Sequence, residues 1–316
     1  MSTTSNETWP RVAVMGAGAV GCYFGGMLAS AGAPVTLIGR RDRVEAITRY
    51  GLFIDSIHFQ ESVAVAASTQ ADAARDADLI LFCVKTLDTE ESARLLQPHL
   101  KPGATVVSLQ NGVDNVERIR GATRTASAKS GIEALPAVVY VAAAMSAPGR
   151  VKHSGRGDLV LGHSARRAEV ERVARTFERA SVPCRISENI EGDLWVKLIL
   201  NCAGNAVTAL GRSSYGRAAQ HELARQVMKA TAEEAIAVAR AAGIQLPPAD
   251  FVAAGLDLAK NLGPATSSTA QDIERGKRTE IDSLNGYITR SGAALGVPTP
   301  VNHTLYALVK LLEENP

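Results

Sequence analysis

The segment Gly16-Ala-Gly-Ala-Val-Gly21 restricts the fold of this chain more than any other feature. It follows an apolar run over residues 11–15 and precedes a helical pattern over residues 19–31. In such a strand–turn–helix unit the first glycine permits a tight turn, the second lets a pyrophosphate approach the backbone, and the third lets helix and strand pack closely. The N–H groups at the helix start favour an anion. We therefore expect a dinucleotide site, rather than a glycine turn without a ligand, at Gly16, Ala17, Gly18, Ala19, Val20 and Gly21.

Further apolar runs predict a mostly parallel sheet in the first part of the chain. Continuous runs of Val, Ile and Leu indicate strands that are covered on both faces, and they occupy residues 34–38, 78–84 and 104–109. Helices between such strands give right-handed crossovers, which is the pattern of a doubly wound, Rossmann-type α/β domain. Later runs are expected to extend the sheet, partly antiparallel, at residues 138–141, 149–153, 158–161 and 182–186.

The sequence also predicts where the domains begin and end. A length of 316 residues suffices for two domains. Residues 11–187 are expected to form the Rossmann-type domain, and helical periodicity predicts a mostly helical domain over residues 188–316. Residues 1–10 are polar and are expected to form a disordered tail. The helical domain has expected breaks at Gly211, Pro247-Pro248, Gly263-Pro264 and Pro298.

Composition excludes several classes of function. The formal net charge of +2 argues against nucleic-acid binding over a large surface. Apolar runs are too short for a membrane span, and the first ten residues lack the apolar segment of a signal peptide, so the cytoplasm is the expected compartment. The histidines form no cluster and the cysteines lack metal-ligand spacing, so no metal is expected. The cysteines, expected to be mostly buried reduced thiols, are Cys22, Cys83, Cys184 and Cys202.

The residues after the second expected strand, Gly39-Arg40-Arg41, favour NADP(H) over NAD(H). A carboxylate at this point binds the ribose 2′-hydroxyl of NAD, whereas a guanidinium group binds a 2′-phosphate through charge-assisted hydrogen bonds. Asp42 follows closely, and the alternative is that both arginines are solvated surface charges.

Two polar residues follow strands of the expected sheet. Lys85 comes directly after the run 78–84, and Asn111 follows the run 104–109. Ligands of open parallel sheets bind at the carboxyl ends of strands, so Lys85 is a candidate for a phosphate or a substrate charge. Asn111-Gly112 is equally consistent with a simple turn.

A stripe of polar residues interrupts an apolar helical pattern in the second half. Lys197, Asn201 and Asn205 recur at a spacing of four residues, which puts them on one side of a helix. An ammonium group and two amides on a buried helix need partners, and a bound anion or carbonyl group supplies them. The alternatives are a lysine that extends to solvent and amides that bond to neighbouring backbone.

Taken together, these motifs resemble the ketopantoate reductases (2-dehydropantoate 2-reductases), NADPH-dependent enzymes of the pantothenate pathway. The resemblance extends from about residue 11 to residue 310, and the helix with Trp195, Lys197, Asn201 and Asn205 is its most specific part. The other matching segments are Gly16–Gly21, Val84-Lys85, Gln110–Gly112, Ser267–Ile273 and Thr279–Gly286.

The resemblance implies hydride transfer to the ketone carbon of a 2-oxo acid, with Lys197 as the proton donor and Asn201 and Asn205 as substrate-binding amides. Ser268, which reads as a helix N-cap, resembles the serine that meets the substrate carboxylate. Asn111 is similar to the asparagine between cofactor and substrate. The implied cofactor-side residues are Lys85, Arg40 at the 2′-phosphate and Glu280 at the nicotinamide.

The segment Ser213–Tyr215 departs from the family, because it lacks a further substrate-contacting asparagine that other members have after this helix. Either Ser214 or Tyr215 substitutes for it, or the pocket suits another acid. The alternative functions are therefore reduction of another branched 2-oxo acid or of an opine-type imine and, from a different class, dinucleotide sensing without chemistry. The Ala-rich helical domain offers a face for a homodimer.

Overall fold

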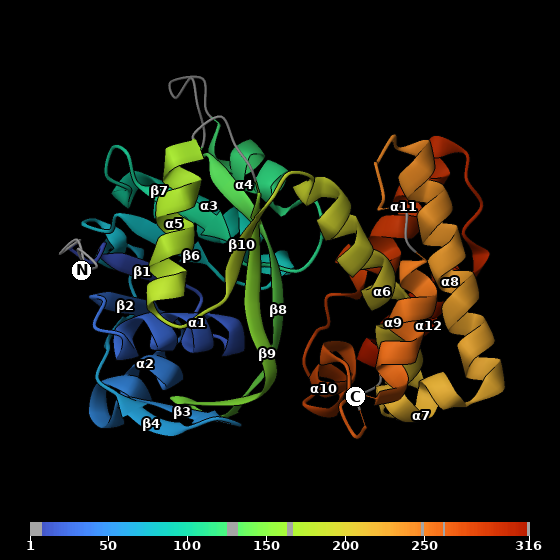
Figure 1. Cartoon of the computed structure of the whole chain (residues 1–316), viewed down its shortest axis with the longest axis horizontal. Helices are drawn as coiled ribbons and strands as arrows, with labels where there is room; N and C mark the ends of the chain where they lie inside the picture. Colours follow the sequence, from blue (N-terminus) through green and yellow to red (C-terminus); the bar gives the residue numbers. More distant parts are fainter. Residues whose placement is uncertain (1–7, 125–131, 163–166, 248–249, 262, 315–316) are drawn as a thin grey trace, which may run out of the picture. The chain divides into compact units, whose positions relative to one another are not determined.

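The computed structural model describes residues 8–124, 132–162, 167–247, 250–261 and 263–314. The chain forms two compact units, unit 1 (Met1–Ile190) and unit 2 (Glu191–Pro316). Unit 1 contains a Rossmann-type sheet and unit 2 is helical, as predicted (Figure 1). Of the tail expected over residues 1–10, residues 1–7 lie outside the described part. Trp9 is ordered against unit 1, because the Arg179 guanidinium lies 3.7 Å from the centroid of its ring.

In the described residues, the strands of unit 1 join in the order β4-β3-β9-β8-β7-β6-β1-β2-β5, and β10 pairs with β9. The pairs from β8 through β7, β6, β1 and β2 to β5 are parallel, whereas β8–β9 and β3–β4 are antiparallel. The strands are β1 (Val12–Met15), β2 (Val35–Ile38), β3 (Leu52–Ser56), β4 (Gln60–Val63), β5 (Ala66–Ser68), β6 (Leu79–Phe82), β7 (Thr105–Ser108), β8 (Ala134–Ala147), β9 (Arg150–Gly162) and β10 (Cys184–Ser187). The helices are α1 (Ala19–Ser30), α2 (Arg41–Tyr50), α3 (Thr89–Leu96), α4 (Asn115–Thr123) and α5 (Arg167–Arg179), with 3-10 turns η1 (Ala71–Ala74), η2 (Thr86–Asp88) and η3 (Gln97–His99).

The central parallel strands are buried on both faces. Val14 of β1 belongs to a core cluster that includes residues of α1 and α5, whereas the next residue, Met15, belongs to a cluster with α3 and α4 (Figure 1). The two clusters occupy opposite faces of the sheet, because successive side chains of a strand point to opposite faces. Phe24 of α1 and Phe177 of α5 meet edge to face at 6.2 Å. Burial on both faces explains why continuous apolar runs predicted these strands correctly.

The sheet is larger than the sequence analysis predicted. β3, β4 and β5 were not predicted, and β4 and β5 stand at the two ends of the strand order. β4 is largely exposed, so no apolar run marks it. The runs expected as two strands over residues 149–153 and 158–161 form the single strand β9. Arg156 and Gly157 interrupt that pattern with φ angles of +53° and +137°, where the pairing with β8 is irregular.

Unit 2 is built around α6, whose buried residues include Asn205 of the polar stripe. Buried polar side chains attach the later helices to α6 and to one another. The Asn285 amide donates to the Cys202 carbonyl at 3.2 Å and to the Asn302 side chain at 3.0 Å. Glu234 accepts from the backbone N–H groups of Val301 and Asn302, at 2.8 and 2.9 Å, at the start of α12. The elements are α6 (Ile190–Leu210), α7 (Tyr215–Gln220), α8 (Glu222–Ala241), α9 (Phe251–Asn261), α10 (Ser268–Glu274), η4 (Ile281–Ser283), α11 (Asn285–Leu295) and α12 (Pro300–Glu314).

Candidate functional site

The glycine loop of unit 1 joins β1 to α1. Gly16 has a φ of +112°, and a Cβ atom there would lie 2.7 Å from both the carbonyl carbon of Cys83 and the nitrogen of Val84. Only glycine therefore fits the turn beside the chain that leaves β6. The N–H groups of Gly16 and Ala17 donate to the Ile38 carbonyl at 3.0 and 2.9 Å, so the loop is also bound to the end of β2.

Gly18 and Gly21 differ in their surroundings. Gly18 is the N-cap of α1, and an added Cβ would meet only the Arg43 Nη1 atom, at 3.8 Å. This open position adjoins the helix start, whose first N–H groups lack intrahelical partners and favour an anion. A Cβ at Gly21 would lie 2.1 Å from the Gly16 carbonyl oxygen and 2.8 Å from Val14 Cγ1, so glycine is required for α1 to pack this closely. Cofactor binding by the loop stays a prediction.

Arg40 follows β2 as the N-cap of α2, and it is exposed. The adjacent Gly39 packs against the glycine loop, because a Cβ there would lie 2.6 Å from the Ala17 Cβ. Arg43 donates from Nη1 to the Ala17 carbonyl at 2.8 Å and so supports the loop from α2. Arg43 was not predicted as a site residue, although it lies only three residues after Arg40, in the first turn of α2.

Lys85 and Asn111 follow the neighbouring parallel strands β6 and β7, and both are half-buried. The Asn111 carbonyl accepts hydrogen bonds from Thr86 Oγ1 at 3.1 Å and from Asn115 Nδ2 at 2.7 Å. Because Thr86 directly follows Lys85, these bonds join the two loops. The glycine loop, Arg40, Lys85 and Asn111 therefore lie at the carboxyl edge of four adjacent strands, β7-β6-β1-β2, which is where open parallel sheets bind ligands.

Gln110 is a supporting residue to which the sequence analysis assigned no role. Its side chain is buried beneath the loops that follow β6 and β7. It donates from Nε2 to the Val84 carbonyl at 3.1 Å and to Thr89 Oγ1 at 2.8 Å, and it accepts from Ser108 at 3.0 Å. A buried amide with these partners fixes the course of both loops.

The stripe predicted on α6 is present in unit 2. Lys197 and Asn201 are half-buried, and Asn205 is only 2% exposed. The Asn205 side-chain oxygen accepts a hydrogen bond of 2.6 Å from the Tyr215 hydroxyl. Ser214 accepts from the Arg217 N–H at 3.3 Å as the N-cap of α7. Of the two residues considered in this segment, Tyr215 is thus the one that contacts the stripe.

The N-cap of α10 is Ser267, which corrects the expectation that Ser268 has this role. Ser267 Oγ accepts from the Ala270 N–H at 3.0 Å, donates to the Asn205 carbonyl at 3.2 Å, and lies 2.8 Å from Thr208 Oγ1. Ser268 is the first helical residue and is exposed. Either serine suits a cap by residue type, and the buried partners on α6 determine which of them serves. This cluster fastens the start of α10, and hence Ser268, to the Asn205 turn of α6.

Ser267→Ala is expected to lower the free energy of unfolding by about 1–2 kcal/mol, because it removes a helix cap and a buried hydrogen bond. Urea denaturation measures this change. The matched control is Ser268→Ala, whose effect should stay within about 0.5 kcal/mol, as is usual for an exposed residue. Equal losses in both variants would contradict the assignment of the cap.

Glu280 is half-buried and is the N-cap of η4, after α10 has ended at Glu274, so Ser268 and Glu280 do not share one helix. The preceding residue, Thr279, donates to Glu313 from its N–H at 2.7 Å and from its hydroxyl at 2.6 Å. Burial opposes ionisation of Glu313, but hydrogen bonds from Lys310 and Thr279 lower its pKa on balance. The ionised Glu313 of α12 therefore anchors the segment that carries Glu280.

Other features of the described residues bear on function. The four cysteines are free, and burial raises the pKa of the Cys22 thiol to about 12, so this thiol is a poor nucleophile.

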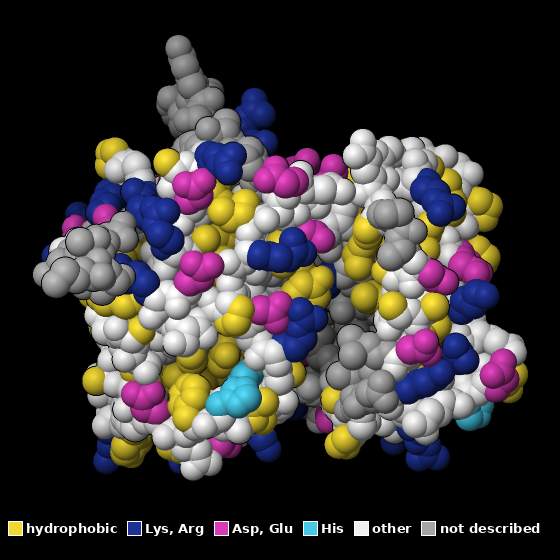
Figure 2. All heavy atoms as spheres, viewed as in Figure 1, with side chains coloured by type: hydrophobic (Ala, Val, Ile, Leu, Met, Phe, Trp, Pro, Cys, Tyr) yellow, Lys and Arg dark blue, Asp and Glu magenta, His cyan; other side chains and the backbone are white. Residues whose placement is uncertain are grey.

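His, Cys, Asp and Glu side chains in the described ranges do not form a group of three or more suited to a metal ion. Each helix in those ranges is too short or too polar to cross a membrane. Positive and negative side chains are interspersed on the face in Figure 2.

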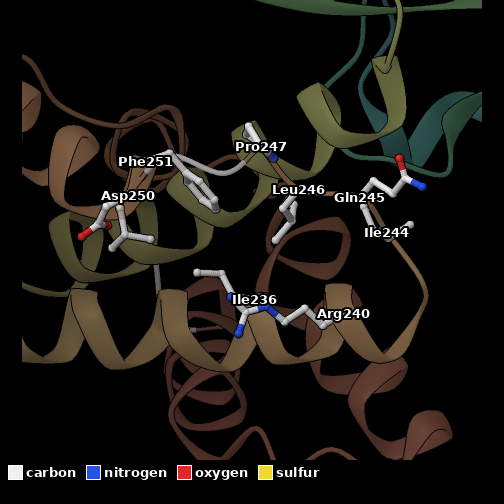
Figure 3. Close-up of a pocket in the computed structure, with 9 residues that line it drawn as sticks. Ile236, Arg240, Ile244, Gln245, Leu246, Pro247, Asp250 and Phe251 are labelled. Carbon is white, nitrogen blue, oxygen red and sulfur yellow. The ribbon is translucent and has the colours of Figure 1, made fainter.

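A cavity of about 630 Å³ lies in unit 2 beside α8 and the start of α9 (Figure 3). Apolar side chains line it together with the polar Gln245 and two charged residues, Arg240 of α8 and Asp250. None of the predicted site residues lines this cavity. Its lining consists of Ile236, Arg240, Ile244, Gln245, Leu246, Pro247, Asp250, Phe251 and Val252.

The glycine loop at a Rossmann-type sheet edge, with a Lys–Asn stripe in a helical unit, is the arrangement of a dinucleotide-dependent oxidoreductase. Residues 12–166 match the family model described as "Ketopantoate reductase PanE/ApbA", and residues 189–313 match the model of its C-terminal part. The chain belongs to the ketopantoate reductase family. It is accordingly an oxidoreductase that uses a nicotinamide dinucleotide cofactor and acts on a 2-oxo acid.

Named relatives resemble this chain over nearly its whole length. The 2-dehydropantoate 2-reductase of Pyrococcus abyssi is 32% identical over 304 residues, which is 95% of this chain and 97% of that protein. A PanE/ApbA family ketopantoate reductase from Ralstonia eutropha JMP134 is 48% identical with a TM-score of 0.89, covering 96% of this chain and 99% of that chain. The 2-dehydropantoate 2-reductase structure from Geobacter metallireducens is 28% identical with a TM-score of 0.87, covering 95% and 99%.

Proposed function

We propose that this protein reduces 2-dehydropantoate (ketopantoate) to pantoate with NADPH, in pantothenate and coenzyme A biosynthesis. The names of its relatives support this substrate. The observation that carries the proposal is the stripe on α6, where the half-buried Lys197 and Asn201 precede the buried Asn205. A module that only senses a dinucleotide would not need an ammonium group and two amides in this arrangement.

Lys197 is the proposed proton donor. When bound, the reduced nicotinamide supplies a hydride to the C2 ketone carbon, and negative charge develops on the ketone oxygen. The Lys197 ammonium polarises this oxygen and donates a proton to it. Asn201 and Asn205 orient the substrate without adding charge, because amides bind both carboxylate and hydroxyl groups. Ser268, at the exposed start of α10, is the proposed carboxylate ligand.

Residues 11–187 are the proposed cofactor-binding domain, and residues 188–316 the proposed substrate and catalytic domain. The open position at Gly18 and the helix start behind it fit a pyrophosphate. Arg40 fits a 2′-phosphate, because it is exposed directly after β2. Lys85 is assigned to the cofactor side, Asn111 to the region between cofactor and substrate, and Glu280 to the nicotinamide side.

Arg40→Ala is expected to weaken NADPH binding by about tenfold or more while NADH binding changes by less than about twofold, because only NADPH has a 2′-phosphate for a guanidinium to bind. Fluorescence titration with each cofactor measures both constants. Arg49→Ala, an exposed arginine on the same helix, is the matched control and should bind both cofactors normally. Equal weakening of NADPH and NADH would exclude a specific phosphate contact.

The test of the function itself is an assay of purified protein with NADPH and ketopantoate, followed by loss of nicotinamide absorbance. Turnover of ketopantoate supports the proposal. Turnover of a different branched 2-oxo acid or of an imine, with none of ketopantoate, would reassign the substrate. Binding of NADPH without turnover of any of these compounds would favour a sensing role.

A further inference from the structure

The first turn of α2 carries more positive charge than the start of a helix favours. Arg40 is the N-cap, and the turn that follows contains Arg41 and Arg43, with Asp42 as its acidic residue. The partial positive charge of a helix N-terminus favours anions and disfavours cations. Guanidinium groups gathered at this end therefore lower the stability of the helix unless an anion offsets their charge.

The start of α2 also offers hydrogen-bond donors. The side chain of the N-cap residue, Arg40, contains no acceptor, so this side chain cannot cap the helix. The N–H groups of Arg43 and Val44 both donate to the Arg40 carbonyl, at 3.1 Å. The N–H groups that precede them in a helix have no intrahelical partner. Backbone donors of this kind beside guanidinium groups are suited to a phosphate.

Arg43 connects this turn to the glycine loop. Its Nη1 atom donates to the Ala17 carbonyl at 2.8 Å, and a Cβ atom at Gly18 would lie 3.8 Å from the same Nη1. The Arg43 side chain is half-buried. A guanidinium group has five N–H donors in a rigid plane, and the bond to Ala17 uses one of them. The other donors are thus positioned beside the loop.

Arg40 and Arg43 adjoin the same contact between loop and strand. Gly39, the residue before Arg40, packs on Ala17, whose carbonyl accepts from Arg43. The end of β2, the glycine loop and the first turn of α2 therefore meet at Ala17. In a Rossmann-type domain the ribose whose 2′-position distinguishes the two cofactors lies at the end of the second strand. A phosphate monoester has a charge of about −1.5 to −2 near neutral pH, which two guanidinium groups match better than one.

We propose, on the basis of the NADPH specificity proposed above, that Arg43 is a second ligand of the 2′-phosphate. Its guanidinium group binds the phosphate together with Arg40 while its Nη1 keeps the bond to Ala17. The phosphate also accepts from the N–H groups that begin α2, so that it caps this helix and offsets the charge of its first turn. Asp42 lies in this turn as well, but residues two apart on a helix do not face each other, so its carboxylate does not share the Arg40 side.

Fluorescence titration with NADPH and NADH tests this role. Arg43→Ala is expected to weaken NADPH binding by about tenfold or more, because a charge-assisted hydrogen bond is lost. NADH binding should weaken by less than about threefold. The comparison separates two roles of Arg43, because the glycine loop serves the pyrophosphate that both cofactors contain. Loss of support for the loop alone would weaken both cofactors equally.

Two controls make the result specific. Arg49→Ala removes an arginine from the last turn of α2 and should keep the wild-type ratio of NADPH to NADH affinity. Adenosine 2′,5′-bisphosphate and adenosine 5′-monophosphate repeat the comparison without a nicotinamide, so that the result does not depend on turnover. Arg43→Ala should lose affinity for the bisphosphate alone.

Equal weakening of NADPH and NADH in Arg43→Ala, or unchanged NADPH affinity, would overturn the direct contact and leave the role of Arg40 standing. If Arg43→Ala does not fold, Arg43→Gln, which removes the charge but keeps an N–H donor, decides between the same outcomes. Wild-type protein that binds NADPH no more tightly than NADH would overturn the 2′-phosphate site as a whole, including Arg40, whereas the reductase reaction is tested separately by turnover of ketopantoate.

Discussion

Lys197→Ala is expected to lower kcat for ketopantoate by about 10²- to 10⁴-fold, the usual contribution of a positioned general acid. The affinity for NADPH should change by less than about twofold, because the proposed role of Lys197 is at the ketone oxygen and the predicted cofactor contacts are elsewhere. Stopped-flow kinetics and a cofactor titration measure the two effects separately.

Two further variants separate proton donation from charge. Lys197→Arg keeps a positive charge, but a guanidinium group does not release a proton near neutral pH, so this variant should stay almost as slow as the alanine variant. Lys229→Ala removes an exposed lysine of α8 and should leave turnover unchanged. Turnover near the wild-type rate in Lys197→Ala would remove the basis of the mechanism.

Gly21→Ala is expected to lower the free energy of unfolding by about 3 kcal/mol or more, the upper end of the range for overpacking. The new methyl group would lie 2.1 Å from the Gly16 carbonyl oxygen, so α1 must move away from β1 or the glycine loop must change shape. NADPH affinity should therefore fall as well, by about tenfold or more. Urea denaturation and fluorescence titration measure the two losses.

Gly121→Ala is the matched control for this change. Gly121 also lies in a helix, α4, but a Cβ atom there would meet nothing within 4 Å. Its replacement should raise stability by roughly 0.5–1 kcal/mol, because alanine has the higher helix propensity. A Gly21→Ala protein with normal stability and normal NADPH affinity would show that close packing at this position is not required.

The strands that were predicted from the sequence are those whose side chains are buried along their whole length. The central strands are buried on both faces, so their residues are apolar without alternation and are recognisable without a structure. β4 has mostly exposed side chains and β5 has only three residues, so their positions depend on pairing with other strands. Pairing across distant residues is not visible in a local pattern, and for the same reason the continuity of β9 through Arg156 and Gly157 was missed.

The candidate site was predictable where a single helix or loop defines it. The stripe on α6 follows from helical spacing alone, and the glycine loop follows from its strand–turn–helix context. The contacts of Arg43 with Ala17, of Tyr215 with Asn205 and of Ser267 with α6 each join two different secondary-structure elements or loops. A local sequence pattern does not show such contacts. Residue type indicated that a serine caps α10, but only burial could distinguish Ser267 from Ser268.

The strand β8 has a consequence for how unit 1 can be divided. It pairs in parallel with β7, where Val107 lies opposite Leu135, and in antiparallel fashion with β9. A fragment that ended after α4 would retain the glycine loop but lose the partner of β7. The backbone groups beside Val106 and Val107 would then be open to pairing with another molecule. Nucleotide-binding fragments of this protein should consequently extend through the β8–β9 hairpin if they are to stay unaggregated.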